Sequence, residues 1–264
     1  MDLAAASLAR RLILLAAITW LVAPALAADP RPEAALKTRA IDAKVFLDDR
    51  IKADPALAAD SLAEGRKWLD KNAADAAAEL KQDPEFFKEG GWTYERKYNV
   101  RSIVADRYVS VVRGDYVDTR AAHPNSDVNT ILWDKTARKR ISIRPFFVET
   151  VDNGPAMTAM LRAVVTALKT EKTKRGATDT ASTEWSKALE PKLLKIGAIA
   201  LAPSTEAARS SGLLFYYPPY AVGAYAEGPY TAFLPWEVLK PHLSPEGAAI
   251  FGGARPKGDD DEAQ

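Results

Sequence analysis

The chain has 264 residues, no cysteine and two histidines, with 36 lysines and arginines against 35 aspartates and glutamates. The absence of cysteine excludes disulfides, thiol catalysis and thiolate metal ligands, and two histidines far apart in the sequence exclude a histidine-rich zinc site. The even charge balance argues against nonspecific nucleic-acid binding and polybasic membrane binding, because both need a basic excess.

Residues 1–27 have the pattern of a secretory signal peptide. Arg10 and Arg11 precede an apolar stretch at residues 12–22, and a small-residue cleavage site ends at Ala27. The apolar stretch is too short to cross a bilayer comfortably, and no later stretch is apolar enough to do so. We expect cleavage after Ala27 and a periplasmic or secreted protein without a membrane span; an uncleaved anchor is the alternative.

The next part of the chain, residues 28–91, is expected to be helical. Apolar residues recur at helical spacing over residues 36–51. Asp54 and Pro55 have the residue types of an N-cap and a first helical position, which predicts a second helix running to about residue 80.

From Trp92 the hydrophobic period changes to two, which is typical of strands. The predicted strands are 92–102, 108–117, 127–134 and 140–143. Gly114 is expected to form a bulge or bend inside the second of them. Short connections between successive strands predict an antiparallel meander.

A helix is predicted to follow from Gly154 to about residue 169, with its apolar residues on one face. The polar segment 170–182 is expected to be an exposed loop, because lysines usually face solvent. A further helix around residues 185–194 and a strand at 196–201 complete this part.

The stretch from Gly212 to Pro235 predicts two strands, at residues 213–217 and 229–234, joined by a shaped loop. Two consecutive prolines end the first strand, because proline lacks a backbone donor. The loop is expected to present Tyr220, Tyr225 and Glu227. A short helix at 236–243, broken or kinked by a proline, follows it.

These elements together predict an α+β fold with N-terminal helices, an antiparallel β-meander with packed helices and a closing aromatic hairpin. The expected regions are a helical region at 28–91, an α+β domain at 92–251 and a disordered acidic tail at 252–264.

Two segments carry a family resemblance. Residues 116–125 read Tyr-Val-Asp-Thr-Arg-Ala-Ala-His-Pro-Asn, and residues 215–235 include a Tyr-Ala-Val-Gly-Ala-Tyr-Ala-Glu-Gly-Pro run. They resemble the secreted bacterial domain of unknown function shared by RsiV-type anti-sigma factors and PdaC-type peptidoglycan deacetylases. Arg120 and Ala121 stand where that domain usually has two glycines. The resemblance, over about residues 94–251, implies an exported domain that binds something at the cell envelope without catalytic residues of its own.

The sequence contains no nucleophile-elbow, Ser-x-x-Lys or phosphate-binding glycine motif. His123, near Asp118 and Asp127, is either an acid/base group or part of a turn in which its ring bonds the backbone. Four aspartates are either paired carboxylates for glycoside chemistry or ordinary residents of strand ends: Asp115, Asp118, Asp127 and Asp134. Glu227 among tyrosines fits a sugar-binding site and equally a solvated loop.

We expect a non-enzymatic envelope-binding domain without metal or cofactor, whose partner is a cell-wall glycan or an envelope protein such as a lysozyme-like hydrolase. The expected contacts are Tyr220, Tyr225 and Glu227, with His123 and Asn125 on a neighbouring loop, because tyrosines offer flat amphipathic surface. The alternatives are a small peptidoglycan hydrolase that uses Asp and Glu carboxylates, and a structural domain in which both tyrosines belong to the core.

Overall fold

The computed structural model describes residues 31–180 and 182–259. The predicted signal peptide and the last five residues of the predicted acidic tail lie outside these ranges. The described part contains helices and strands in an α+β arrangement, which confirms the predicted fold class.

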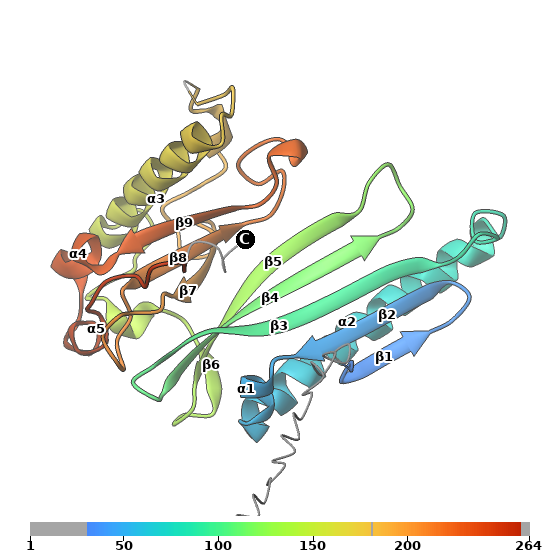
Figure 1. Ribbon diagram of the computed structural model, residues 1–264, viewed down its shortest axis with the longest axis horizontal. Coiled ribbons are helices and arrows are strands. Elements are labelled where there is room, and N and C mark those ends of the chain that lie inside the picture. The colour runs from blue at the N-terminus through green and yellow to red at the C-terminus, as the bar shows by residue number, and fades with distance from the viewer. Residues whose placement is uncertain (1–30, 181, 260–264) are drawn as a thin grey trace, which may run out of the picture. The chain divides into compact units, whose positions relative to one another are not determined.

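The first sheet has six strands in the order β1-β2-β3-β4-β5-β6 (Figure 1). Its strands are β1 (Ala34–Lys37), β2 (Ile41–Leu47), β3 (Trp92–Val104), β4 (Tyr108–Asp118), β5 (Asn125–Asp134) and β6 (Lys139–Ile141). All neighbouring pairs are antiparallel except β2–β3, which is parallel. A parallel pair needs a crossover, and the helix α2 (Pro55–Gln82) supplies it.

The second sheet has three antiparallel strands, β7 (Ala198–Leu201), β8 (Gly212–Tyr217) and β9 (Tyr230–Pro235). The remaining α-helices are α1 (Asp49–Lys52), α3 (Pro155–Lys174), α4 (Trp236–Leu239) and α5 (Pro245–Ile250). Short 3₁₀ helices are η1 (Arg144–Phe146), η2 (Glu184–Ser186), η3 (Tyr225–Glu227) and η4 (Lys240–His242). The strands expected at 213–217 and 229–234 are therefore confirmed.

The helix predicted over residues 36–51 is wrong, because most of this segment forms strands β1 and β2. Ile41, Ala43, Val45 and Leu47 are buried while the residues between them are half-buried. That alternation has the period of a strand, and β2 pairs with β3 across the predicted region boundary at residues 91 and 92. Helix α2 is confirmed, and the Asp54 carboxylate caps it by accepting from the backbone N–H of Ala56 and Leu57, both at 3.1 Å.

No bulge forms at Gly114, which pairs in register with both neighbouring strands. The irregularity lies in β3, where Val100 pairs with Val111 and Ser102 with Ser110, so that Arg101 is the extra residue. The bulge changes which face the even-numbered residues occupy. Val100 lies in the core shared with α2, whereas Val104 lies in the core shared with the second sheet.

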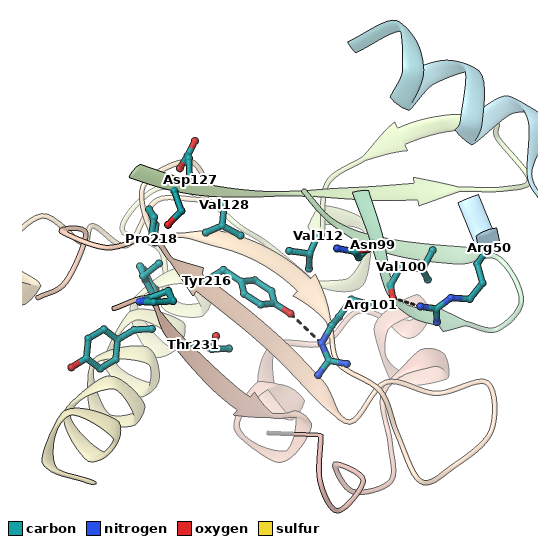
Figure 2. Close-up of a pocket in the computed structure, with 14 residues that line it drawn as sticks. Arg50, Asn99, Val100, Arg101, Val112, Asp127, Val128, Tyr216, Pro218 and Thr231 are labelled. Carbon is teal, nitrogen blue, oxygen red and sulfur yellow. Dashed lines mark hydrogen bonds between the residues drawn. The ribbon is translucent and has the colours of Figure 1, made fainter. Parts of the chain in front are cut away.

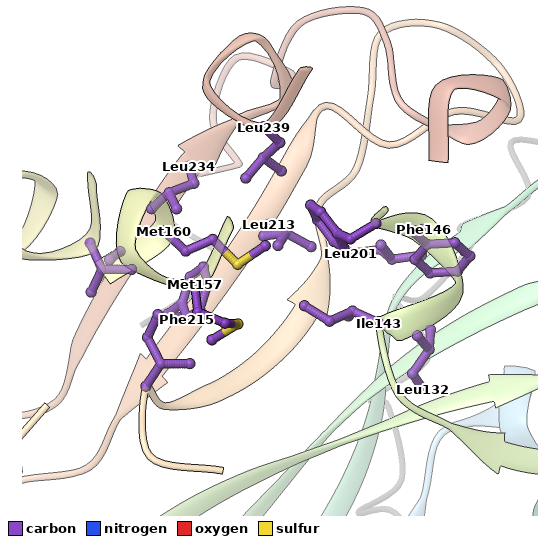
Figure 3. Packing of buried hydrophobic residues seen from close by; sticks show 14 of the residues in the cluster. Leu132, Ile143, Phe146, Met157, Met160, Leu201, Leu213, Phe215, Leu234 and Leu239 are labelled. Atoms are coloured by element: carbon purple, nitrogen blue, oxygen red, sulfur yellow. The ribbon is translucent and has the colours of Figure 1, made fainter. Parts of the chain in front are cut away.

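Helix α3 packs on the outer face of the second sheet (Figure 3). Met157 and Met160 of α3 lie against Leu213 and Phe215 of β8. The intervening residues of β8, Leu214 and Tyr216, form a smaller cluster with Val112 and Val128 of the first sheet. The described chain therefore has one core on each side of this thin inter-sheet layer.

Two serines of the first sheet bind the backbone of the second. The Ser102 hydroxyl donates to the Leu201 carbonyl oxygen at 2.7 Å, and the Leu201 N–H donates to the Ser110 hydroxyl at 2.9 Å. Both serines are buried. These bonds tie β7 to β3 and β4, and they satisfy backbone groups that would be costly to leave unpaired.

Three further expectations are corrected. The helix predicted at 185–194 is a single 3₁₀ turn, η2, followed by turns, and Pro191 is incompatible with a regular helix interior. Helix α3 continues to Lys174, so the loop expected from residue 170 begins later. The described part of the expected acidic tail, residues 252–259, is packed on the protein, with Asp259 buried.

Candidate functional site

Two loops from different sheets meet in an aromatic cluster. The imidazole of His123, in the β4–β5 loop, stacks on the Tyr225 ring, with centroids 3.8 Å apart and planes at 23°. The His123 Nε2 lies 3.1 Å from the Tyr220 hydroxyl, and the two tyrosine rings are 5.4 Å apart. The β4–β5 loop and the β8–β9 loop, predicted as neighbours, are therefore in direct contact.

The Pro124 carbonyl oxygen joins these loops by accepting two hydrogen bonds. The Tyr225 hydroxyl donates to it at 2.6 Å, and the His123 Nδ1 lies 3.0 Å from it. Because a carbonyl only accepts, the His123 Nδ1–H donates to it, and Nε2 is the ring nitrogen that faces the Tyr220 hydroxyl. The expected turn in which the His123 ring bonds the backbone is thus present.

Both loops contain a non-glycine residue in the left-handed region. Arg120 has φ +60°, and its guanidinium donates to the carbonyl oxygens of Phe86 and Gly90 at 2.8 and 3.0 Å. The tight turn thus forms with an arginine where the resembling domain usually has glycine. Tyr220 has φ +71° and is 62% exposed. Such strain is usual at positions held for function.

Glu227 faces the protein rather than the solvent. Its carboxylate accepts from Lys172 Nζ at 2.7 Å, from the Tyr230 hydroxyl at 2.5 Å and from the Ala224 N–H at 2.9 Å. Burial raises the pKa of Glu227, but these hydrogen bonds and the Lys172 charge outweigh burial and lower it to about 2. Glu227 therefore fixes the shape of the loop that carries Tyr220 and Tyr225.

A cleft of about 360 Å³ lies between the two sheets (Figure 2). The first sheet contributes Asn99, Arg101 and Val112, and the second contributes Tyr216 and Thr231. Ser126 and Pro218 also line it, and they connect it along the chain to the aromatic cluster, because Ser126 follows His123 by three residues and Pro218 precedes Tyr220 by two. The walls combine apolar surface with a few hydrogen-bonding groups, as small-molecule sites usually do.

Arg101 lines this cleft on the same face of β3 as Asn99. Its Nε donates to the Tyr216 hydroxyl at 3.1 Å, as Figure 2 shows, and its Nη2 donates to the Asp259 carboxylate at 2.5 Å. Only 8% of the arginine side chain is exposed. Because of the bulge, the next residue, Ser102, also faces the second sheet, so two consecutive side chains of β3 contact it.

Three of the four candidate carboxylates have separate partners, and the fourth, Asp127, is exposed on β5 opposite Asp115. Asp115 receives two hydrogen bonds from Arg96 at 2.5 and 2.6 Å, and Asp134 is held by Arg107 at 2.7 Å. Asp118 accepts from the Arg120 N–H at 2.8 Å. These three carboxylates have separate structural partners on the described chain.

The five predicted contact residues therefore divide into two groups. Tyr220, Tyr225 and His123 form one cluster, and Asn125 is exposed at the start of β5 beside it, whereas Glu227 points inward. The cleft residues Asn99, Arg101, Tyr216 and Thr231 were not predicted. The alternation from Trp92 to Ser102 puts Asn99 and Arg101 on one face, but no local pattern shows that the second sheet covers that face.

Within residues 31–180 and 182–259, no three His, Asp or Glu side chains gather into a metal-binding group. In the same part of the chain, no helix has both the length and the apolar character needed to cross a bilayer.

One family model matches the part of this site that the second sheet contributes. Residues 151–237 match the model of a family described as "Protein of unknown function (DUF3298)". Among solved structures, a DUF3298 family protein from Pseudomonas aeruginosa PAO1 is similar, with 18% identity, a TM-score of 0.50 and coverage of 80% of this chain and 87% of that chain. A DUF3298 family member from Bacteroides fragilis NCTC 9343 is 15% identical, with a TM-score of 0.44 and coverage of 72% and 70%. A search of curated proteins found no match.

The matched segment contains α3, the second sheet and the aromatic loop. It includes the second of the two motifs, residues 215–235, and confirms the predicted resemblance to a domain of unknown function, whereas the first motif, residues 116–125, lies outside the match.

Proposed function

Since the chain carries a DUF3298 domain at residues 151–237, we propose that it is an exported, non-catalytic module that binds a cell-wall glycan. The glycan would lie in the cleft between the two sheets and against the aromatic cluster formed by His123, Tyr220 and Tyr225. The family match itself names neither a ligand nor a binding position.

The observation that carries this proposal is the exposed face of Tyr220 beside a cleft with hydrogen-bonding walls. Tyr220 is 62% exposed although it is held in a strained backbone conformation, and it contacts His123 rather than a hydrophobic core. The C–H face of a pyranose ring is apolar and its edge carries hydroxyls. An exposed tyrosine offers a flat surface to the apolar face of the sugar ring, and amide and hydroxyl side chains bind the hydroxyls at its edge.

The cleft also has suitable polar groups. Asn99 is an amide that can both donate and accept, and the guanidinium of Arg101 donates. Tyr216 and Val112 provide apolar area between these groups. This mixture suits a ligand that is polar at its edges and apolar on its faces.

The test is co-sedimentation of the protein with purified peptidoglycan sacculi. We expect wild type to pellet and Tyr220→Ala to lose most of the bound fraction while keeping its circular dichroism spectrum, because the side chain is exposed. Leu194→Ala is the matched control, since it removes an exposed apolar side chain, 93% accessible, outside the cleft. Wild-type protein that stays in the supernatant would refute glycan binding and direct attention to an envelope protein as partner.

A further inference from the structure

We infer that the Arg101 end of the cleft is a carboxylate-binding subsite, and that Asp259 of the C-terminal segment occupies it in this structure. The inference rests on the proposed function and narrows it: the glycan would carry a carboxylate, which replaces that of Asp259.

The subsite consists of two guanidinium groups on one carboxylate. Arg101 Nη2 donates to one oxygen of Asp259 at 2.5 Å, and Arg255 Nε donates to the other. The Tyr216 hydroxyl accepts a hydrogen bond from Arg101 Nε at 3.1 Å and so orients the guanidinium. These are the donors that bind carboxylates most strongly, because both partners are charged.

The subsite is shielded from water. The side chains of Arg101, Asp259 and Arg255 are 8%, 4% and 16% exposed. Burial raises the pKa of Asp259, but the hydrogen bonds and charges of both arginines outweigh burial and lower it. The occupant is therefore an ionised carboxylate, and the three side chains together carry a net charge of +1.

The position of Asp259 in the chain makes exchange possible. The segment after α5 is fixed at its beginning, where the Thr205 N–H donates to the Ala254 carbonyl at 2.8 Å and the Trp236 indole donates to the Gly253 carbonyl at 3.1 Å. Asp259 lies five residues further on and reaches across to β3. It can leave without disturbing these anchors.

Exchange by a ligand carboxylate leaves no buried charge unpaired. The ligand would accept the same hydrogen bonds from Arg101 and Arg255, and the released Asp259 would be hydrated. Loss of Asp259 without a replacement would instead remove the carboxylate from the buried guanidinium of Arg101, which is costly. The site therefore favours acidic ligands over neutral ones.

The test compares two disaccharides that differ by one lactyl carboxylate, N-acetylglucosaminyl-N-acetylmuramic acid and di-N-acetylchitobiose, by isothermal titration calorimetry. We expect Asp259→Asn to bind the acidic disaccharide about tenfold more tightly than wild type, equivalent to about 1.4 kcal/mol, with no change for chitobiose. Arg101→Met should remove the preference for the acidic sugar. Asp134→Asn, which alters an arginine-paired aspartate outside the cleft, should change neither affinity.

Equal affinities for both disaccharides in all variants would overturn the subsite and leave glycan binding intact. Failure of both sugars to bind would refute the proposed function. In that case chemical rescue tests whether the subsite binds a carboxylate. Sodium formate, compared with sodium chloride at equal ionic strength, should raise the melting temperature of Asp259→Ala more than that of wild type or of the Asp259→Ala, Arg101→Met double variant. Equal shifts in all three proteins would overturn the subsite.

Discussion

Lys172 is a fully buried lysine, and it decides the shape of the aromatic loop. Its ammonium donates to the Glu227 carboxylate at 2.7 Å and to the Val222 carbonyl at 3.0 Å, and it lies 3.1 Å from an Asp179 carboxylate oxygen. A buried ammonium is stable only when paired in this way. The contacts therefore hold the middle and the C-terminal part of the β8–β9 loop against helix α3.

The same residue explains why Glu227 was misjudged from the sequence. Lys172 falls in a segment expected to be an exposed loop, where lysines usually lie. Because Lys172 was expected to face solvent, the Glu227 carboxylate was predicted to contact a ligand. Tyr220, Tyr225 and His123 were placed correctly beside each other because the two motifs that contain them were recognised as parts of one domain.

We expect Glu227→Gln to lower the free energy of unfolding by about 3 kcal/mol at pH 7, because it removes the charge that balances buried Lys172. The pKa of Glu227 is about 2 in the folded protein and ordinarily 4.5. The stabilisation is thus complete above pH 4.5 and is lost as the pH falls toward 2. Urea denaturation between pH 7 and pH 2 should show the difference from wild type shrinking over that window.

The control for this prediction is Glu237→Gln, which alters an exposed glutamate of α4. It should stay within about 0.5 kcal/mol of wild type at every pH. A constant gap between wild type and Glu227→Gln down to pH 2 would show that the ion pair is not what stabilises the loop.

Tyr225→Phe tests the hydrogen bond that joins the two loops. The hydroxyl that donates to the Pro124 carbonyl is lost, while the stack on His123 remains. We expect a cost of about 1 kcal/mol in unfolding free energy, and a larger one for Tyr225→Ala, which loses the stack as well. Tyr116→Phe, at an exposed tyrosine of β4, is the control. Identical stabilities for Tyr225→Phe and Tyr225→Ala would mean that the stack contributes nothing.

At the level of elements, strand β2 shows how a short apolar segment misleads. Apolar residues in 36–51 satisfy a helical spacing as well as an alternating one, and periodicity alone does not separate the two over so few residues. Pairing with β3 decides the outcome, because β2 gains a partner strand along its whole length. Helix α2 and strands β8 and β9 were predictable because a cap and two prolines mark their ends.

Gly65 of α2 is expected to resist replacement although it lies in the middle of a helix. A Cβ at this position would stand 2.8 Å from Val45 Cγ1 of β2. Alanine favours helices by about 1 kcal/mol over glycine. Val45 is fully buried and its χ1 angle is restricted, so it cannot move aside. We therefore expect the cost of the clash to exceed the gain in helix propensity, and Gly65→Ala to lower the free energy of unfolding by about 1–2 kcal/mol.

The measurement for Gly65→Ala is a double-mutant cycle with Val45→Ala in urea. Removing the valine methyl groups should relieve the clash, so the double variant should be more stable than the sum of the single effects implies. Strict additivity, or a Gly65→Ala variant more stable than wild type, would contradict close packing of α2 on β2.

On the scale of the whole described chain, the sheets share one inter-sheet layer, and β2 crosses the expected boundary at residue 91 to join β3. No local pattern predicts this continuity, because the paired residues, such as Ile41 and Trp92, lie 51 positions apart in the chain. Residues 31–180 and 182–259 belong to one compact unit.

We therefore expect a single unfolding transition. Leu57→Ala in the core under α2 and Leu213→Ala in the core under α3 each remove a fully buried side chain and should cost about 2–5 kcal/mol. In each variant, far-UV circular dichroism and tryptophan fluorescence should give the same urea midpoint. Two separated transitions in either variant would show that the parts unfold independently.

The extra residue in β3 reverses the alternation of side chains between the two faces of the sheet. Even-numbered residues shortly before Arg101, such as Val100, face helix α2, whereas even-numbered residues after it, such as Val104, face the second sheet. Loss of that one residue would make the ladder regular and would leave its neighbours on their present faces, because the pair Ser102–Ser110 already follows the pair Val100–Val111. Ser102 and Val104 would stay against the second sheet, and only the Arg101 guanidinium would be lost from the cleft. Among related chains, a gap aligned at this position would mark a protein in which the two sheets meet in the same way but the cleft lacks this arginine.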